Sequence, residues 1–536
     1  MVQCSGTIRG LSWPNSRCPT KMVAGLLAFV FHLVRLDFAM RVFGTVSVRC
    51  LSCLLSTVLM GQSTGQTWAD EPPAAPREFR AAWVATVENI DWPSKRGLST
   101  AEQQAEIDRI VDVAAELNLN AIVLQVRTAA DALYASKLEP WSIYLTGNQG
   151  VAPEPFYDPL DYWVTAAHAH GIELHAWFNP YRAQMKPGEL ADSHVSHTMP
   201  DSVKQYDRYL WMDPGSKQAA EHSLAVFNDV VRRYDIDGVH IDDYFYPYPV
   251  TKDDVKVPFP DDLSWAEYQA SGGPLERADW RRKNINNLIE KIYTTTHAIK
   301  PHVRFGISPF GIGRAGTAPG ISGFDQYHEL YADASLWLRQ GWCDYFTPQL
   351  YWPIGQQAQS FPVLLDYWHS ENAQSRYIWP GLYTSRVGSK NKAYELQEIP
   401  NQIQVTRSRS DSPGHVHFSM KALLENREGL VDALKAGVYR SPALSPAMTW
   451  LDDTPPARPI VQADRTPSSG LTLKLTAGDH EAVWLWSVWT RANGEWNFSV
   501  HPGHASTIDL DASTIEWVVS AVDRCGNESL RVASSN

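Results

Sequence analysis

The chain has little cysteine after its first 53 residues, and this limits what can hold the fold together. Of its six cysteines, only Cys343 and Cys525 follow residue 53. Two cysteines so far apart form no disulfide framework, and this part of the chain has no CxxC pair suited to a structural metal. We therefore expect a large hydrophobic core, rather than cross-links, to stabilise the protein.

Three other absences exclude common classes of function. The formal net charge is −12, so the chain lacks the positive excess with which proteins neutralise nucleic-acid phosphates. No glycine-rich phosphate motif follows the first candidate strand, which argues against a dinucleotide site. No GxSxG segment indicates a serine hydrolase, and we find no internal repeat and no low-complexity tract.

Long apolar runs occur only near the beginning, at residues 22–40 and 42–60. Starting at Met40, the order of an arginine, an apolar run and a polar stretch with small residues up to Ala69 is typical of a secretory signal. We expect residues 1–69 to be an upstream extension and a signal peptide. The protein would then be exported to the periplasm, cell envelope or exterior, with no stable membrane span after cleavage. An uncleaved anchor is the alternative, and Arg49 weakens it because it interrupts the second run.

From residue 80 onward, short apolar runs alternate with helix-like stretches, as in a parallel sheet with crossover helices. The sequence predicts an α/β fold for residues 70–450, a (β/α)8 TIM-type barrel with long βα loops. The eight predicted strands are residues 80–86, 121–127, 173–179, 238–242, 304–308, 344–350, 377–382 and 414–419. The predicted helices are residues 101–117, 159–170, 218–234, 280–299, 331–341 and 399–407.

The pattern changes after Trp450. Residues 451–460 are rich in proline and predict a linker. Residues 461–536 contain short alternating runs separated by turn residues, which favours a small all-β sandwich. The segment 521–529 resembles the last strand and turn of fibronectin type III modules, so we expect a fibronectin type III-like domain.

The sharpest chemical signal is the segment DGVHIDDYFYP at residues 237–247. It places Asp242 and Asp243 at the end of the fourth predicted strand, where the reactive groups of a barrel lie. Two carboxyl groups at a barrel mouth are the equipment for glycosidic cleavage, because one protonates the leaving oxygen and the other acts as nucleophile or base. Asp131, after the second strand, is a third catalytic candidate. The alternative roles are structural: loop fixation for one of the pair and a turn or helix cap for Asp131.

Polar and aromatic residues follow nearly every other predicted strand. Aromatic rings stack on sugar faces, and the chain contains 21 Trp, 22 Tyr and 17 Phe, although most of these belong in the core. The predicted substrate-binding residues are Arg127, Trp177, Asn179, Arg182, His240, Tyr244, Gln349, Tyr351 and Trp352. We predict no cofactor and no metal, since His175, His240 and His417 are scattered rather than spaced as ligands.

These motifs resemble the bacterial glycosyl-hydrolase-like family 10, and they follow one another in family order over about residues 77 to 445. The matching segments are RAAWVAT (80–86), DWP (91–93), QVR (125–127), DALY (131–134), HAWFNPYR (175–182), WMDPG (211–215), DGVHIDDYFYP (237–247), DWRR (279–282), FGISP (305–309) and PQLYWP (348–353). The resemblance implies a cell-envelope glycosidase whose polysaccharide substrate is peptidoglycan glycan strands without stem peptides. It does not tell which aspartate is the acid.

Two other functions fit part of the pattern. A non-catalytic barrel that binds cell-wall glycan would keep the aromatic residues but would not need two aspartates. A metal-dependent polysaccharide deacetylase would use the histidines as ligands.

Overall fold

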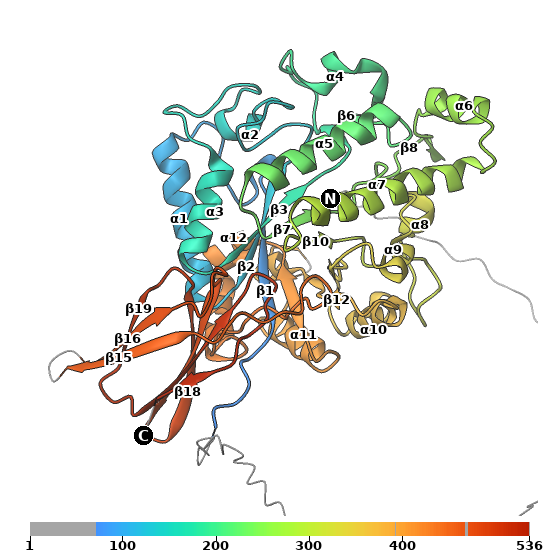
Figure 1. Ribbon diagram of the computed structural model, residues 1–536. Helices are drawn as coiled ribbons and strands as arrows, with labels where there is room; N and C mark the ends of the chain where they lie inside the picture. Colours follow the sequence, from blue (N-terminus) through green and yellow to red (C-terminus); the bar gives the residue numbers. More distant parts are fainter. Residues whose placement is uncertain (1–70, 392, 467–469, 535–536) are drawn as a thin grey trace, which may run out of the picture. The chain divides into compact units, whose positions relative to one another are not determined.

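The parallel sheet predicted from the sequence is present in the computed structural model, which describes residues 71–391, 393–466 and 470–534 (Figure 1). Its strands coincide with all eight predicted positions, and the seventh is divided in two. They are β1 (Phe79–Val84), β2 (Ala121–Arg127), β3 (Glu173–Phe178), β7 (Gly238–Ile241), β10 (Arg304–Ile307), β11 (Tyr345–Phe346), β12 (Tyr377–Ile378), β13 (Gly381–Leu382) and β14 (Gly414–His417).

The sheet closes on itself through this divided seventh strand. The strand order is β12-β11-β10-β7-β3-β2-β1-β14-β13, so the two ends of the sheet belong to one extended segment, 377–382. Its first half pairs with β11, where Tyr345 lies opposite Tyr377. Its second half pairs with β14, where Gly381 lies opposite Val416. All pairs are parallel, and the predicted (β/α)8 barrel is confirmed.

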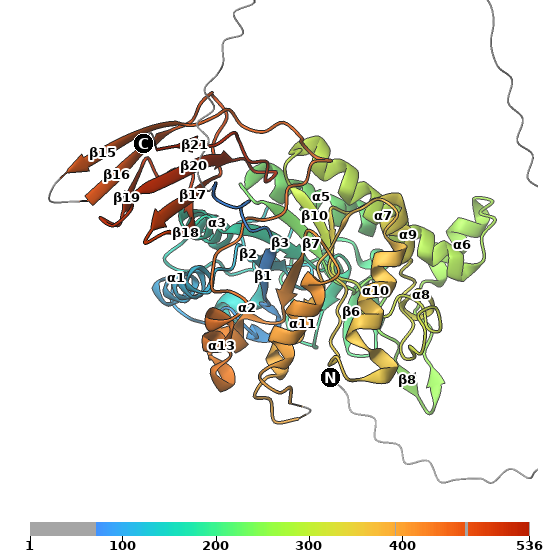
Figure 2. The same ribbon diagram turned by 90° about the horizontal axis from the view of Figure 1, so that it is seen from below.

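Helices follow the strands and surround them (Figure 2). All six predicted helices are present, as α1 (Thr100–Glu116), α3 (Pro159–Ala169), α5 (Lys217–Arg233), α7 (Arg277–Ile299), α9 (Ala334–Gln340) and α11 (Glu398–Arg407). The prediction omitted α10 (Phe361–Glu371), α12 (Met420–Leu424) and α13 (Leu430–Ala436). The apolar residues of α10 recur at helical spacing, since Phe361, Leu364, Leu365 and Trp368 are buried, so the signal for this helix was present in the sequence.

Long insertions follow the carboxyl ends of several strands, as predicted. Their elements are α2 (Ile143–Thr146), β4 (Arg182–Gln184), α4 (Val195–Thr198), β5 (Val203–Tyr206), β6 (Tyr209–Met212), β8 (Thr251–Lys252), β9 (Val255–Lys256), α6 (Asp262–Ala270) and α8 (Gln326–Glu329). Single 3-10 turns cover Val87–Asn89, Pro200–Ser202, Gln357–Gln359, Thr384–Arg386 and Arg427–Gly429. Because these insertions extend from the reactive end of the barrel, they form the walls around any site there.

The C-terminal part of the chain is all-β. Its strands are β15 (Ile460–Thr466), β16 (Gly470–Thr476), β17 (Leu485–Ala492), β18 (Glu495–Pro502), β19 (Thr507–Leu510), β20 (Glu516–Val522) and β21 (Val532–Ala533). They form two antiparallel sheets, β15-β16-β19 and β18-β17-β20-β21. Trp486, Val488, Leu473 and Val519 share a buried core. The short alternating runs expected in this part of the chain are thus strands, and the proline-rich segment before Ile460 has no regular structure.

The predicted signal peptide lies outside the described residues. None of the helices in the described part of the chain is long and apolar enough to cross a membrane. Cys343 and Cys525 are buried and not bonded to each other, as expected from their separation.

A buried ion pair connects the C-terminal sheets to the beginning of the fourth barrel strand. Arg524 contacts Asp237 at 2.7 Å and Asp235 at 3.1 Å, and its guanidinium lies over the Trp484 ring at 4.8 Å. Burial raises the pKa of the Asp237 carboxyl, but the charge of Arg524 and a hydrogen bond from His168 outweigh this and hold the pKa well below its usual range. The C-terminal sheets therefore stabilise the barrel.

We expect Arg524→Ala to lower the free energy of unfolding by roughly 2–4 kcal/mol at pH 7, because it leaves Asp237 buried without its cation. The loss of stability should become smaller in acid. A carboxyl group with a lowered pKa stabilises the fold at pH values above the ordinary aspartate pKa, and this stabilisation disappears as the group is protonated at lower pH. Urea unfolding at pH 7 and at about pH 4 measures both effects. The control is Arg409→Ala, which breaks an exposed ion pair with Asp366 and should cost less than about 1 kcal/mol.

Candidate active site

Asp242 lies just beyond β7 and is held from the neighbouring strand β3. The Trp177 Nε1 donates a hydrogen bond to Asp242 Oδ2 at 3.0 Å, and Asn179 Nδ2 donates to Oδ1 at 3.2 Å. Asp242 is 3% exposed. Both donors come from the segment that the sequence singled out, but they contact the carboxyl group. In this structure they position the Asp242 carboxyl group, and their role as direct sugar ligands stays a prediction.

Asp243 follows Asp242 beyond the end of β7 and has other hydrogen-bond partners. The Tyr248 hydroxyl donates a hydrogen bond to its Oδ2, and the Gln349 side chain also bonds to the carboxyl group. Gln349 in turn donates to the Ser308 carbonyl at 2.9 Å, so its amide is held in place. The two carboxyl groups are therefore supported from different directions, Asp242 from β3 and Asp243 from the loop after β11. Sequence reasoning missed Tyr248, although it lies only five residues after Asp243.

Burial raises the pKa of both aspartates, and different neighbours modify the effect at each. Burial raises the pKa of Asp242 to about 7, with a further contribution from the Asp243 charge and an opposing one from Arg182. Burial also raises the pKa of Asp243, but the hydrogen bonds from Tyr248 and Gln349 counteract it. At neutral pH Asp242 therefore holds its proton in a substantial share of the molecules. Such a pair can divide the roles of acid and base.

Arg182 and Tyr244 lie beside this pair, as predicted. The Arg182 Nε donates to the Thr128 carbonyl at 2.9 Å, and its guanidinium lies over the Tyr244 ring at 4.6 Å. Tyr244, Gln349, Tyr351 and Trp352 are the partly exposed members of the predicted binding set, whereas Arg182 is buried.

Arg127 and His240, two members of the predicted binding set, are buried and bonded to protein groups, and their binding role stays a prediction. Arg127 is fully buried, where its Nε donates to Glu139 at 2.7 Å and its Nη1 donates to the Asn179 carbonyl. Its charge is therefore neutralised inside the protein, and its contact with Asn179 supports the residue that holds Asp242. His240 is also fully buried and lies inside the barrel.

The barrel histidines bind protein groups through both ring nitrogens. His240 contacts the Tyr345 hydroxyl at 3.0 Å and the Ser308 hydroxyl at 3.0 Å, and His175 contacts Tyr345 at 2.8 Å and Glu173 at 3.0 Å. His417 contacts the hydroxyls of Thr384 and Tyr439. Because these nitrogens already have partners, the three residues do not form the ligand set that a metal-dependent deacetylase needs.

Asp131 lies in a separate cavity at the ends of β1, β2 and β3. This cavity has a volume of about 180 Å³, and Glu88, Arg96, Tyr144 and Lys186 also line it. Asp131 accepts hydrogen bonds from the Thr128 hydroxyl at 2.5 Å and from the Ala129 N–H at 3.0 Å. These bonds match the alternative role as a turn residue. The structure does not bring Asp131 into contact with the aspartate pair.

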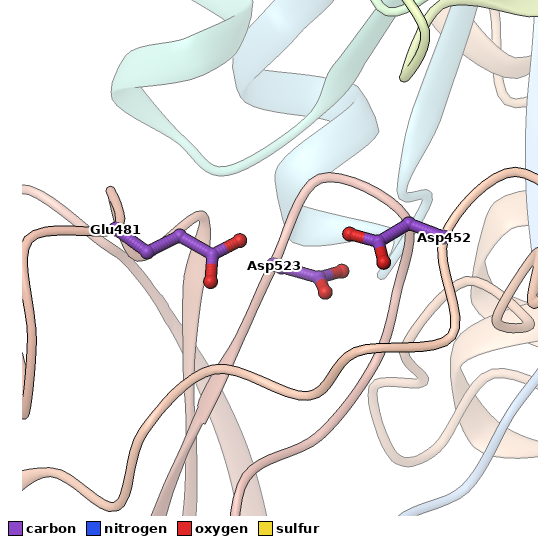
Figure 3. A group of neighbouring side chains, drawn as sticks. All are labelled: Asp452, Glu481 and Asp523. Atoms are coloured by element: carbon purple, nitrogen blue, oxygen red, sulfur yellow. The ribbon is translucent and has the colours of Figure 1, made fainter.

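A larger cavity of about 440 Å³ lies at the ends of the sixth and seventh strands, and Tyr351 and Trp352 line it. Asp242 and Asp243 line neither cavity, and their strand lies between the two groups of strands in the barrel order. Elsewhere, the carboxyl groups of Asp452, Glu481 and Asp523 point toward one another within 4.8 Å (Figure 3). Asp523 already accepts hydrogen bonds from Asn527, and we assign no ion to this group.

Comparison with known proteins identifies relatives of the barrel. The model of the family described as glycosyl hydrolase-like 10 matches residues 78–396. Glycosyl hydrolase YngK of Bacillus subtilis is 39% identical over 414 residues, which cover 74% of this chain and 79% of that protein. Glycosyl hydrolase DigH of Escherichia coli K12 is 34% identical over 353 residues, covering 60% of this chain and 77% of that protein.

Among solved structures, the glycoside hydrolase domain of PgaB (BpsB) from Bordetella bronchiseptica is similar, with 14% identity and a TM-score of 0.43 over 67% of this chain and 98% of that chain. The catalytic domain of β-amylase from Paenibacillus polymyxa has 12% identity and a TM-score of 0.44, and the match covers 69% of this chain and 99% of that chain.

We expect Asp242→Asn to become more stable relative to the natural protein as pH rises from about 4 to about 7. A carboxyl pKa that is raised in the folded state contributes stability below the ordinary aspartate pKa, and this contribution is lost as pH rises through the raised value. Asparagine does not ionise, so the free energy of unfolding of the variant, relative to that of the natural protein, should rise by about 2–4 kcal/mol over this pH range. Urea unfolding across this pH range measures the difference, with Asp411→Asn at an exposed position as control. A difference that does not change with pH would contradict the burial argument.

Proposed function

The chain belongs to the glycosyl hydrolase-like 10 family, and we propose that it is an exported glycosidase that cleaves peptidoglycan glycan strands free of stem peptides. The observation that carries the catalytic part is the pair Asp242 and Asp243, two buried carboxyl groups with different supports at the reactive end of a barrel. The substrate and the export rest on the motif resemblance and on the signal-like residues 1–69.

In the proposed reaction, Asp242 is the general acid. Its raised pKa keeps a proton on the carboxyl group near neutral pH, and this proton passes to the glycosidic oxygen as the bond to the anomeric carbon breaks. In its ionised form, Asp243 stabilises the positive charge that develops on the sugar ring. It then accepts a proton from the water molecule whose oxygen forms the new bond to the anomeric carbon. If the N-acetyl oxygen of the sugar bonds to that carbon first, the same water breaks this bond in a second step and restores the N-acetyl group.

The surrounding side chains orient these two groups. Trp177 and Asn179 fix the Asp242 carboxyl group, and Tyr248 and Gln349 fix that of Asp243. Fixed donors of this kind need little reorganisation during the reaction, which is the main electrostatic advantage of an enzyme over water. A glycan-binding scaffold would not need to bury two carboxyl groups, so this arrangement favours catalysis over the non-catalytic alternative.

We expect Asp242→Asn and Asp243→Asn each to lower the hydrolysis rate roughly 10²–10⁴-fold, because each removes a proton-transfer group. The experiment incubates residues 70–536 with peptide-free peptidoglycan strands and analyses the released oligosaccharides by mass spectrometry. Asp131→Asn, in the separate cavity, should have a smaller effect than either. Normal cleavage by both variants of the pair would place the catalytic site elsewhere, and no product from the natural protein would refute the proposed substrate.

The pH dependence of kcat/KM provides a second test. We expect activity to fall about tenfold per pH unit above pH 7, since the acid form of Asp242 disappears there. The low-pH limb should reflect protonation of Asp243. Addition of EDTA should leave the rate unchanged. A rate that continues to rise above about pH 8 would show that Asp242 is not the acid.

A further inference from the structure

The larger cavity at the barrel mouth has the composition of a sugar-binding site. Its volume of about 440 Å³ is within the range of small-ligand sites, roughly 300–1,000 Å³. Tyr351, Trp352 and Tyr394 contribute aromatic rings to its wall, and Arg386 and Gln356 contribute hydrogen-bond donors. Apolar ring faces together with a few polar groups match the alternating apolar faces and hydroxyl edges of a pyranose.

This wall is rigid. The Tyr394 hydroxyl donates to the Tyr351 carbonyl at 2.9 Å, and Gln402 Nε2 donates to the Trp352 carbonyl at 3.1 Å. The Trp352 ring packs edge-on against Phe310 at a centroid distance of 5.7 Å. Gly311 makes this packing possible, because a Cβ there would lie 2.7 Å from the Trp352 ring and 2.4 Å from the Gln349 carbonyl. Ring faces held in place lose little conformational freedom when a ligand binds.

One short segment connects the wall of the cavity to the aspartate pair. Gln349 bonds to Asp243, and Tyr351, two residues later, interacts electrostatically with Asp243 while lining the cavity. Tyr351 therefore belongs both to the cavity wall and to the surroundings of Asp243. Two carboxylates, Glu395 and Glu398, and one cation, Arg386, line the cavity, so its formal charge is negative and disfavours an anionic ring.

We propose that this cavity is a subsite for an uncharged pyranose, such as an N-acetylated amino sugar, next to the ring whose bond is cleaved. The proposal rests on the proposed function, because it takes the aspartate pair as the cleavage point. In a glycan strand in which every second sugar carries a carboxylate, the subsite binds the sugar that has no carboxylate. It thereby helps to select which bond lies at the aspartates.

Binding measured without turnover tests the subsite. In an Asp243→Asn background, calorimetry with tetra-N-acetylchitotetraose compares Trp352→Ala with Trp342→Ala. Trp342 is the matched control, because it is also partly buried but precedes β11 at the other end of the barrel. We expect Trp352→Ala to raise Kd about tenfold, equivalent to about 1.4 kcal/mol, and Trp342→Ala to leave it within about twofold.

Tetragalacturonate, which carries a carboxylate on each ring, should bind at least tenfold more weakly than the uncharged probe. Equal effects of the two tryptophan substitutions would overturn the subsite, and equal affinity for the two probes would overturn its preference for uncharged rings. The proposed function fails separately, if the natural protein releases nothing from peptide-free strands. Cleavage of those strands with no dependence of binding on Trp352 would refute the subsite alone.

Discussion

The removal of two adjacent carboxyl groups from water is the constraint on which the mouth of this barrel depends. A buried ionised carboxyl group is costly unless donors replace its hydration, and Asp242 and Asp243 are 3% and 2% exposed. The donors are supplied by Trp177 and Asn179 on one side and by Tyr248 and Gln349 on the other. The compensation is incomplete for Asp242, so its proton remains bound up to about pH 7. A carboxyl group that exchanges its proton near neutral pH is thus produced by burial that the fold only partly offsets.

The polar interior of the barrel supports this arrangement from below. The Tyr345 hydroxyl connects His175 to His240, and the Trp83 Nε1 donates to His240 Nε2 at 3.2 Å. At the far end, Glu173 bonds to His175 and pairs with Arg304. Such connected hydrogen bonds fix side-chain orientations more strictly than an apolar core would. They hold the inner faces of strands β3, β7 and β11, from which the donors and the aspartates extend.

Periodicity and strand ends made the architecture predictable, whereas contacts between loops did not. The alternation of apolar runs located all eight strands. The rule that reactive groups follow strand ends singled out Asp242 and Asp243, which the structure places just beyond β7 as a buried pair. The roles of individual residues were harder to predict. Arg127 has the residue type of a ligand for sugar hydroxyls, but Glu139, twelve residues later, folds back to neutralise it. The larger cavity combines residues 351–356 with residues 386–398, a pairing that depends on the loop conformations and has no local signal.

The fourth strand shows how strongly environment decides the chemistry of one residue type. Asp237 at its beginning and Asp242 at its end are both buried, and burial raises the pKa of each. At Asp237 the cation of Arg524 lies at 2.7 Å, and the carboxyl group stays ionised and inert. At Asp242 the nearest charges are those of Arg182 and Asp243, which oppose each other, and the donors are neutral N–H groups. One end of the strand is therefore a structural ion pair, while the other is left able to exchange a proton near neutral pH. The difference arises from what packs against each end, since the residue and the strand are the same.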